Sequence, residues 1–276
     1  MQSIDRESLG GLTDGRSWAP FVWVAVMEAE PHLCSISAAV DPVVQVYLLG
    51  SVDFQAAQAL QRRLVFEIAG NRSAAALLLC EHPPLISVGR QGSWAHILYD
   101  REELRRRRWP VRWVNRGGGC ILHTPGQLAI YPILALDRLR LGVQDYLDRL
   151  QAVFVELLDD FNIRGESHPG QVGVWVKRRA IASVGVAIRD WVTYYGAALN
   201  VNPDLQPFRF VHTDGPAGRT MTSIEREHYG RLRPALVRER LLEHFVDRFG
   251  FARTSLFFHH PLLERKAPSD ALATSS

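Results

Sequence analysis

Cysteine is scarce in this chain of 276 residues. Its three cysteines, Cys34, Cys80 and Cys120, form no CxxC pair. An odd number of cysteines without close spacing argues against a disulfide framework and against a zinc site. We therefore expect reduced thiols and a cytoplasmic protein.

Long apolar runs are missing as well. The apolar run at residues 18–27 is too short to cross a bilayer, which takes about 20 residues. Asp5, Glu7 and Asp14 lie among the first residues, whereas a signal peptide begins with a basic segment. We predict no membrane contact, and we interpret residues 1–42 as a loosely docked or disordered extension.

Neither sign of charge dominates the chain. Its 32 Lys and Arg against 29 Asp and Glu give a formal net charge of +3, so the chain is no polycation and nucleic-acid binding is not expected. The motifs GxSxG, HExxH and the phosphate-binding P-loop are also absent from the sequence. This removes the support for a hydrolase, a zinc protease or a P-loop nucleotide-binding protein.

The segment at residues 115–136, NRGGGCILHTPGQLAIYPILAL, carries the clearest signal in the sequence. Three consecutive glycines let the backbone bend sharply and point its amides at a ligand. A short apolar strand, a second turn and a buried strand follow. Structural glycines would explain a hairpin alone. A plain hairpin requires neither Arg116, nor His123, nor the Pro-Gly-Gln turn, so we interpret the segment as part of a ligand site.

Hydrophobic periodicity predicts the remaining elements. Helices are expected over residues 54–70, 100–108, 145–161 and 235–249, and strands over residues 43–49, 76–80, 86–88, 172–176, 181–188 and 191–201. Strands and helices alternate irregularly, which predicts an α+β fold, a mixed sheet with helices packed mainly on one face. The length and apolar content are sufficient for one domain with a full core.

The glycine-rich segment resembles the signature of the lipoyl(octanoyl) transferases, whose pattern is RGG, a short apolar run, HGPGQL and a YPI strand. Here RGG, His123, PGQL and YPI occur in the same order, with Thr124 in place of a family glycine. The resemblance extends over residues 46–227, through VYLLGSVDFQ, EHPPLISVGRQG, GVWV and ALNVNPDL. It implies the biotin/lipoate protein ligase fold in a single domain over residues 43–255, followed by a tail at residues 256–276.

The resemblance also implies a role in protein lipoylation. The expected ligand is an octanoyl or lipoyl group acting as substrate, with no permanently bound cofactor and no metal. The expected partners are acyl carrier protein and lipoyl carrier domains, and the chain is expected to be a monomer. The positions that match ligand-binding residues of the family are Arg116, Gly117, Gly118, Gly119, Cys120, Ile121, Leu122, His123, Ser183, Val184, Gly185, Gly196, Ala197 and Ala198.

The residues that react in the family are changed in this chain. Family members form an acyl-enzyme on a cysteine whose pKa a nearby lysine keeps low. Ala180 stands at the lysine position and Asp214 at the cysteine position, while Tyr195 replaces a family histidine. Lys177 lies three residues before Ala180 and would face the opposite side of a strand. Cys120 is a poor replacement nucleophile, because a lone cysteine in an apolar strand is usually buried with a raised pKa.

Three functional interpretations remain open. The kept pocket and the lost Cys/Lys pair favour a protein that binds an octanoyl or lipoyl group, or its carrier protein, with lost or altered catalysis. A second interpretation is an octanoyltransferase that moves octanoyl from acyl carrier protein directly to a lipoyl-domain lysine, with Asp214 as general base. A third is a non-catalytic docking or regulatory protein that binds an acidic carrier domain through Arg105, Arg106, Arg107, Arg108, Arg112 and Arg116.

Overall fold

The computed structural model describes residues 43–168, 170–212 and 220–263. Within them, seven strands form the main sheet, in the order β10 (Arg253–Phe257), β1 (Val43–Ser51), β2 (Ala76–Glu81), β6 (Gln127–Ile133), β9 (Val192–Asn200), β8 (Arg179–Arg189) and β7 (Gly173–Val176). A small sheet has the order β4 (Val111–Trp113), β3 (Leu85–Val88) and β5 (Cys120–His123). Strand β1 runs parallel to both β10 and β2, and the other pairs in the main sheet are antiparallel. The sheet is therefore mixed, as predicted.

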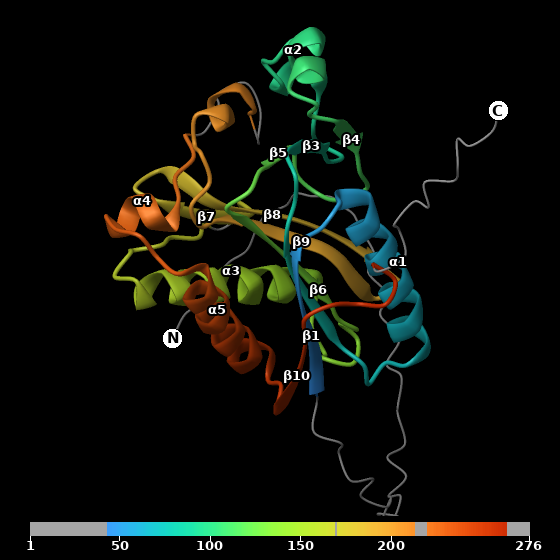
Figure 1. The fold of residues 1–276 in the computed structure, drawn as a ribbon. Coiled ribbons are helices and arrows are strands. Elements are labelled where there is room, and N and C mark those ends of the chain that lie inside the picture. Colours follow the sequence, from blue (N-terminus) through green and yellow to red (C-terminus); the bar gives the residue numbers. More distant parts are fainter. Residues whose placement is uncertain (1–42, 169, 213–219, 264–276) are drawn as a thin grey trace, which may run out of the picture. The chain divides into compact units, whose positions relative to one another are not determined.

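The helices and the small sheet cover both faces of the main sheet (Figure 1). The helices are α1 (Phe54–Gly70), α2 (Arg101–Arg106), α3 (Val143–Asp160), α4 (Ile224–His228) and α5 (Pro234–Phe249), with single turns η1 (Trp94–His96) and η2 (Pro207–Phe210). Helices α3 and α5 share one apolar core with the sheet, and α1 packs in a second core on the other face. The small sheet lies on the α1 face, where it contacts Trp175 and Ala180.

The apolar stripes of the long helices explain this packing. On α3 the residues Tyr146, Leu150, Val153 and Leu157 are all buried. On α5 the buried residues are Val237, Leu241, Phe245 and Phe249, while Leu242 and Val246 are only partly buried. Positions four residues apart share a face of a helix, which accounts for the observed set.

Local signals set the ends of the helices as expected. The Asp53 carboxylate accepts hydrogen bonds from the amides of Gln55 and Ala56 at the start of α1, at 2.9 and 3.0 Å. Helix α5 begins at a proline and ends at Gly250, which adopts a left-handed conformation with φ 71°. None of the helices in the described ranges combines the length and apolar character that a membrane span requires.

The proposed N-terminal extension, residues 1–42, lies outside the described residues, as do residues 264–276 at the other end. Strand β10 continues to Phe257 and pairs with β1 along its whole length. The sequence did not predict this strand, because its side chains are mostly exposed and show no clear alternation.

Candidate functional site

The predicted ligand-binding segments meet where the glycine loop lies against β8. Residues 183–185 pair directly with residues 196–198 of the neighbouring strand β9, so that Gly185 is opposite Gly196. The amide of Gly117 donates to the carbonyl of Val186 at 2.8 Å, which attaches the loop to β8. Three segments that are far apart in the sequence therefore converge. Their contact with a ligand stays a prediction.

Close packing requires the glycines at this junction. Gly118 has φ 77°, in the left-handed region that favours glycine. A Cβ on Gly185 would lie 2.8 Å from the carbonyl oxygen of Gly117 and 3.0 Å from Nη1 of Arg116. A Cβ on Gly89 would lie 2.8 Å from the same Nη1. The loop, β8 and the end of β3 are packed too tightly for side chains at these positions.

Arg116 is buried and is held by hydrogen bonds within the protein. Its Nη2 donates to the carbonyl oxygen of Ser87 at 2.9 Å and to the Ser87 hydroxyl at 2.8 Å. Its Nη1 donates to the carbonyl of Gly117 at 2.9 Å. Only 3% of the residue is exposed, so it contributes nothing to a basic docking surface. The sequence-based prediction that placed Arg116 in such a patch was wrong, because the arginine is used to join β3 to the glycine loop.

His123 lies beside this cluster, at the end of β5. Its Nε2 is 3.0 Å from the hydroxyl of Ser87. Burial lowers the pKa of His123 well below its usual value, and the nearby His82 and Arg116 lower it further. His123 is therefore neutral at physiological pH. Nε2 and the Ser87 hydroxyl share a hydrogen bond, and the same hydroxyl accepts one from Nη2 of Arg116.

His82 supports the strands around the site from the neighbouring turn. Its Nδ1 lies 2.7 Å from the carbonyl of Val52, and its Nε2 lies 2.7 Å from the hydroxyl of Tyr131. A nitrogen that faces a carbonyl must carry the proton, so Nδ1 donates to Val52 and Nε2 accepts from Tyr131. Burial lowers the pKa of His82. His82 is therefore a hydrogen-bonding residue of the turn.

The described thiols are not activated. Cys120 is fully buried in β5, and its thiol donates to the carbonyl of Ser93 across 3.7 Å. Burial raises the pKa of Cys120, although the bond to Ser93 and the charge of Arg116 oppose the shift. Burial also raises the pKa of Cys80. Both cysteines are thus neutral thiols near neutral pH. This agrees with the expectation that Cys120 is a poor nucleophile.

Ala180, which the sequence resemblance predicts to stand at the family's lysine position, lies in an apolar environment. It shares a buried cluster with Trp175, Cys120 and Met221. Its amide donates to the carbonyl of Thr220 at 2.9 Å, and its own carbonyl accepts from the amide of Thr222 at 2.8 Å. The predicted site residue Asp214 belongs to the stretch at 213–219, which lies outside the described residues.

Two basic residues of the β7–β8 turn, Lys177 and Arg179, lie in different environments. Lys177 is exposed at the tip of the turn, with φ 47°. Arg179 forms a bidentate ion pair with the buried carboxylate of Glu227, with Nη2 at 2.6 and 2.8 Å from its two oxygens. Glu227 also accepts a short hydrogen bond from the hydroxyl of Thr222. This pair ties the turn to α4.

Tyr195, at the position of the family histidine, has an unusual backbone conformation. Tyr195 lies opposite Val186 in the neighbouring strand, and the Val186 side chain packs on the face of the sheet that α3 covers. In a regular strand the side chain of Tyr195 would therefore lie on that same face. Its φ of 56° instead brings its ring to the α1 side, 5.1 Å from the ring of Tyr194. The Tyr195 amide donates to Oε1 of Gln61 at 2.7 Å, and the Tyr195 hydroxyl accepts from Nε2 of Gln58 at 2.9 Å.

Comparison with known proteins decides the family. The family model described as "Lipoyl protein ligase A/B catalytic domain" matches residues 53–246, more than half of the chain. The chain belongs to this family. An octanoyltransferase of Geotalea uraniireducens is 38% identical over 204 residues, which is 73% of this chain and 92% of the relative. An octanoyltransferase of Desulfotalea psychrophila is 36% identical over 205 residues, again 73% and 92% of the two chains.

Solved structures of the lipoyl protein ligase family share the fold. A lipoate-protein ligase A bound with ATP aligns with a TM-score of 0.59 at 16% identity, covering 78% of this chain and 87% of the other. A putative lipoate protein ligase from T. acidophilum with bound lipoic acid aligns with a TM-score of 0.60, also at 16% identity, covering 77% and 88%. At this identity the likeness establishes the architecture alone. It agrees with the α+β sheet and the helices described above.

Two residues near the site of this family member were missed in the sequence. Gln58 and Gln61 on α1 bond to Tyr195, and Gln61 is almost fully buried. The signal was present, since Gln61 is a polar residue next to the apolar stripe of Ala57, Leu60 and Leu64. A buried side-chain amide needs a hydrogen-bond partner. The partner of Gln61 is the backbone amide of Tyr195, whose left-handed conformation leaves that amide available.

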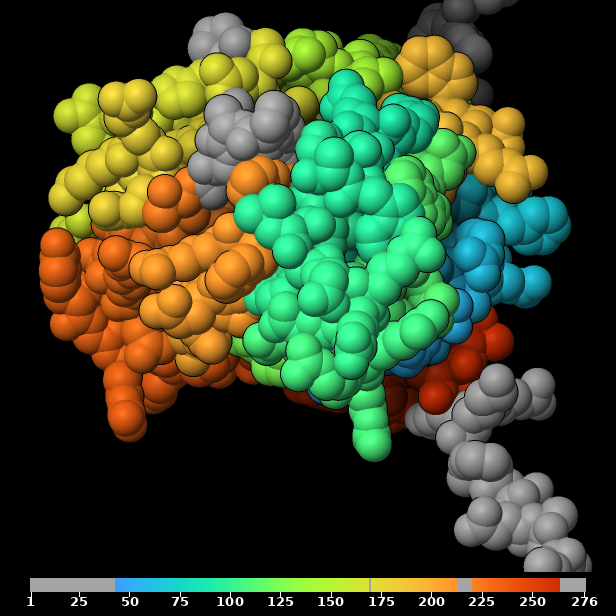
Figure 2. Space-filling view, turned by 90° about the horizontal axis from the view of Figure 1, so that it is seen from above, coloured from blue at the N-terminus to red at the C-terminus, as the bar shows by residue number. Residues whose placement is uncertain are grey.

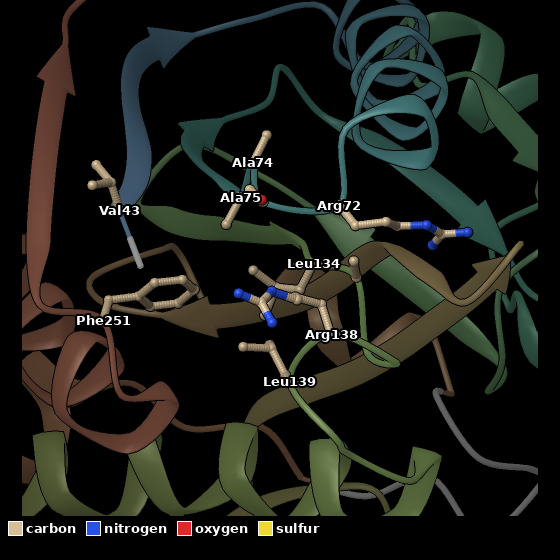
Figure 3. A pocket seen from close by; sticks show the side chains of 10 residues that line it. Val43, Arg72, Ala74, Ala75, Leu134, Arg138, Leu139 and Phe251 are labelled. Carbon is tan, nitrogen blue, oxygen red and sulfur yellow. The ribbon is translucent and has the colours of Figure 1, made fainter. Parts of the chain in front are cut away.

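A hollow at the opposite end of the main sheet is separate from these residues. It has a volume of about 120 Å³ and lies between the start of β1, the turn before β2 and the segment after β6. Figure 3 shows Phe251, Leu134 and Leu139 around it, with the Arg138 guanidinium between them and Arg72 extending away to one side. Its lining includes no histidine, cysteine or carboxylate. No group of three or more metal-ligating side chains forms anywhere in the described ranges.

Proposed function

We propose that this member of the lipoyl protein ligase A/B family binds an octanoyl or lipoyl group, or the carrier protein bearing it, without forming a covalent acyl-enzyme. The burial and protonation of the two described thiols support this proposal most strongly. Cys80 and Cys120 are buried with raised pKa values, and Ala180 occupies the lysine position within an apolar cluster. An acyl-enzyme needs a thiolate with a cation beside it. Neither described cysteine is a thiolate near neutral pH, and the nearby cations Arg116 and Arg179 are bonded to Ser87 and Glu227.

The convergence of the glycine loop with β8 and β9 supports retention of the ligand site. The segments at residues 116–123, 183–185 and 196–198 match family ligand positions, and the hydrogen bond from Gly117 to Val186 holds two of them together. The relatives named octanoyltransferase and the related structure with bound lipoic acid support the same class of ligand.

Intact-mass spectrometry with octanoyl acyl carrier protein tests the proposal. We expect a non-covalent complex in native spectra and an unmodified mass after denaturation. The lipoyl domain is then added, and its mass is followed for the gain of an octanoyl group. An acyl adduct on any residue of this chain, or no complex at all, would overturn the proposal.

Direct transfer is the alternative that the names of the relatives favour. In that reaction Asp214 accepts a proton from the target lysine, whose free pKa is near ~10.4, as the amine attacks the thioester carbonyl. The amide bond forms, the C–S bond breaks, and the carrier thiol leaves with a proton. Complementation of a strain that lacks its own transferase separates the two cases. Growth with the wild type but not with Asp214→Asn would establish direct transfer.

A basic surface around α2 is a candidate contact for an acidic carrier. Arg101, Arg105 and Arg108 line a groove of about 590 Å³ together with Trp94 and Trp109. In Figure 2 the teal and green segment that contains α2 occupies the middle of the face seen from above.

Arg107 is a less available member of the predicted patch, because its guanidinium bonds to Glu103 and lies over Tyr99 and Trp109. Charge reversal at the groove tests the role of this surface. We expect Arg105→Glu to weaken binding of octanoyl acyl carrier protein, and the wild-type affinity to fall as salt rises from low to physiological ionic strength. Lack of any salt dependence would remove the groove from the interaction.

A further inference from the structure

A second cavity opens on the far side of the glycine loop, between α1 and the β8–β9 turn. It has a volume of about 220 Å³ and is lined by Gln58, Gln61, Arg62, Val65, Asn115, Arg189, Tyr194 and Tyr195. Drug-sized pockets span roughly 300–1,000 Å³, so a ligand of this cavity is small. None of these eight residues belongs to the predicted octanoyl site.

The charge of the cavity is positive. Arg62 has no ion-pair or hydrogen-bond partner among the described residues. Arg189 has only its neighbour Asp190, at 3.6 Å and with both side chains largely exposed. Neither guanidinium is committed to the protein, and the lining contains no carboxylate. The cavity therefore attracts an anion and repels a cation.

The neutral polar groups of the cavity also offer donors. Nε2 of Gln61 is buried without a hydrogen-bond partner, while Oε1 of the same side chain accepts from the Tyr195 amide. The Tyr195 hydroxyl accepts from Nε2 of Gln58, which leaves its own proton to donate. A buried donor without a partner is destabilising, so a ligand that supplies an acceptor would be stabilised here.

The apolar part of the lining is flat. The rings of Tyr194 and Tyr195 lie 5.1 Å apart with an angle of 32° between them, and Val65 adds an aliphatic contact from α1. Two tyrosines on the same side of one strand require the left-handed backbone at Tyr195. A left-handed backbone at a residue other than glycine is strained, and strain of this kind clusters at functional sites.

We propose that this cavity binds a small carboxylate with a flat apolar body, of the aromatic carboxylate class. The carboxylate accepts from Arg62, Arg189 and the unpaired amide of Gln61, and the flat body lies against the tyrosine rings. The proposal does not rely on octanoyl binding, although Asn115 and Tyr195 adjoin predicted octanoyl-site residues, so the benzoate experiment can fail without affecting the proposed function.

Calorimetric titration of the full chain with benzoate, benzamide and inorganic phosphate tests the proposal. We expect benzoate to bind and both benzamide and phosphate to bind at least about tenfold more weakly, since one lacks the charge and the other the ring. Benzamide or phosphate binding as tightly as benzoate, or no benzoate binding at millimolar concentration, would overturn it.

Two arginine variants test whether benzoate binds in this cavity. Arg62→Gln and Arg189→Gln alter exposed side chains that make no hydrogen bond in the described structure, so the fold is expected to be kept. Each should weaken benzoate by about tenfold, the effect of losing one charge-assisted hydrogen bond. Arg63→Gln is the matched control, because Arg63 is next on α1 but pairs with Glu67. Unchanged benzoate affinity in both test variants would place the ligand elsewhere and refute the site.

Discussion

The guanidinium of Arg116 donates to both oxygens of Ser87, at 2.9 Å to the carbonyl and 2.8 Å to the hydroxyl. The same hydroxyl lies 3.0 Å from Nε2 of His123. One small side chain therefore contacts a buried cation and one nitrogen of a buried imidazole at the same time. The glycine loop and the two sides of the small sheet depend on this contact.

Ser87→Ala should destabilise the protein, because it leaves Nη2 of Arg116 and Nε2 of His123 short of a partner. Loss of partners for buried polar groups costs about 1–3 kcal/mol, more when a charge is involved. Urea unfolding followed by circular dichroism measures the change. Ser73→Ala, at an exposed position outside the cluster, is the control and should change stability by less than ~0.5 kcal/mol. Equal effects of the two substitutions would contradict the role of the cluster.

Gly185→Ala should displace the glycine loop. Its Cβ would meet the carbonyl of Gly117 at 2.8 Å and Nη1 of Arg116 at 3.0 Å, and overpacking of this kind costs about 1–3 kcal/mol. The expected results are a lower midpoint of thermal unfolding and weaker binding of the octanoyl ligand. Gly70→Ala at the end of α1, where a Cβ would meet nothing within 4 Å, serves as the control. A fully stable Gly185→Ala protein would show that the loop moves freely.

Stability should fall as the pH falls below about 6.5. Burial lowers the pKa values of both His82 and His123, so the unfolded chain takes up protons that the folded chain does not. The stability from the two neutral rings is complete above the unfolded pKa near ~6.5 and is lost on going lower, by up to about 1.4 kcal/mol per pH unit for each ring.

Urea titrations between pH 7.5 and pH 5.5 measure this slope. In His123→Gln the slope should be shallower than in the wild type, because one of the two depressed groups is gone. If the variant has the same slope, His123 is not the titrating group that the burial predicts.

The described thiols should resist alkylation in the native protein. In a Cys34→Ser background, Cys80 and Cys120 are buried with raised pKa values, so iodoacetamide at pH 8 should label neither within minutes. Both should react once urea is added, which is the internal control. Fast labelling of native Cys120, mapped by peptide mass spectrometry, would show that it is accessible and restore it as a candidate nucleophile.

The elements with strong periodicity were predictable from the sequence. Residues such as Tyr146 and Leu157 on α3 follow the helical repeat, and buried strands such as β2 read as continuous apolar runs. Strand β10 was not predictable, since four of its five residues are exposed and its position depends on pairing with β1. An edge strand is defined by its neighbour more than by its own pattern.

The site was predictable only at the level of its segments. The order RGG, His123 and PGQL identified the loop, and the strands at 181–188 and 191–201 were predicted, but the register that places Gly185 opposite Gly196 needed the structure. The partners of Arg116 could not be read from the sequence, because Ser87 lies 29 residues earlier. The sequence also could not predict on which face of the sheet the Tyr195 ring lies, because this depends on the left-handed φ of that residue.

Strand β10 pairs with β1 in parallel, residue for residue from Val43 with Arg253 to Tyr47 with Phe257. The first strand of the sheet therefore receives its outer neighbour only after Phe257 has left the ribosomal tunnel. Until then the backbone groups on that side of β1 form an open edge, which is a template for pairing with another chain. Completion of the sheet is thus a late step in synthesis, and nascent chains that end before residue 253 expose this edge of β1 to pairing with other chains.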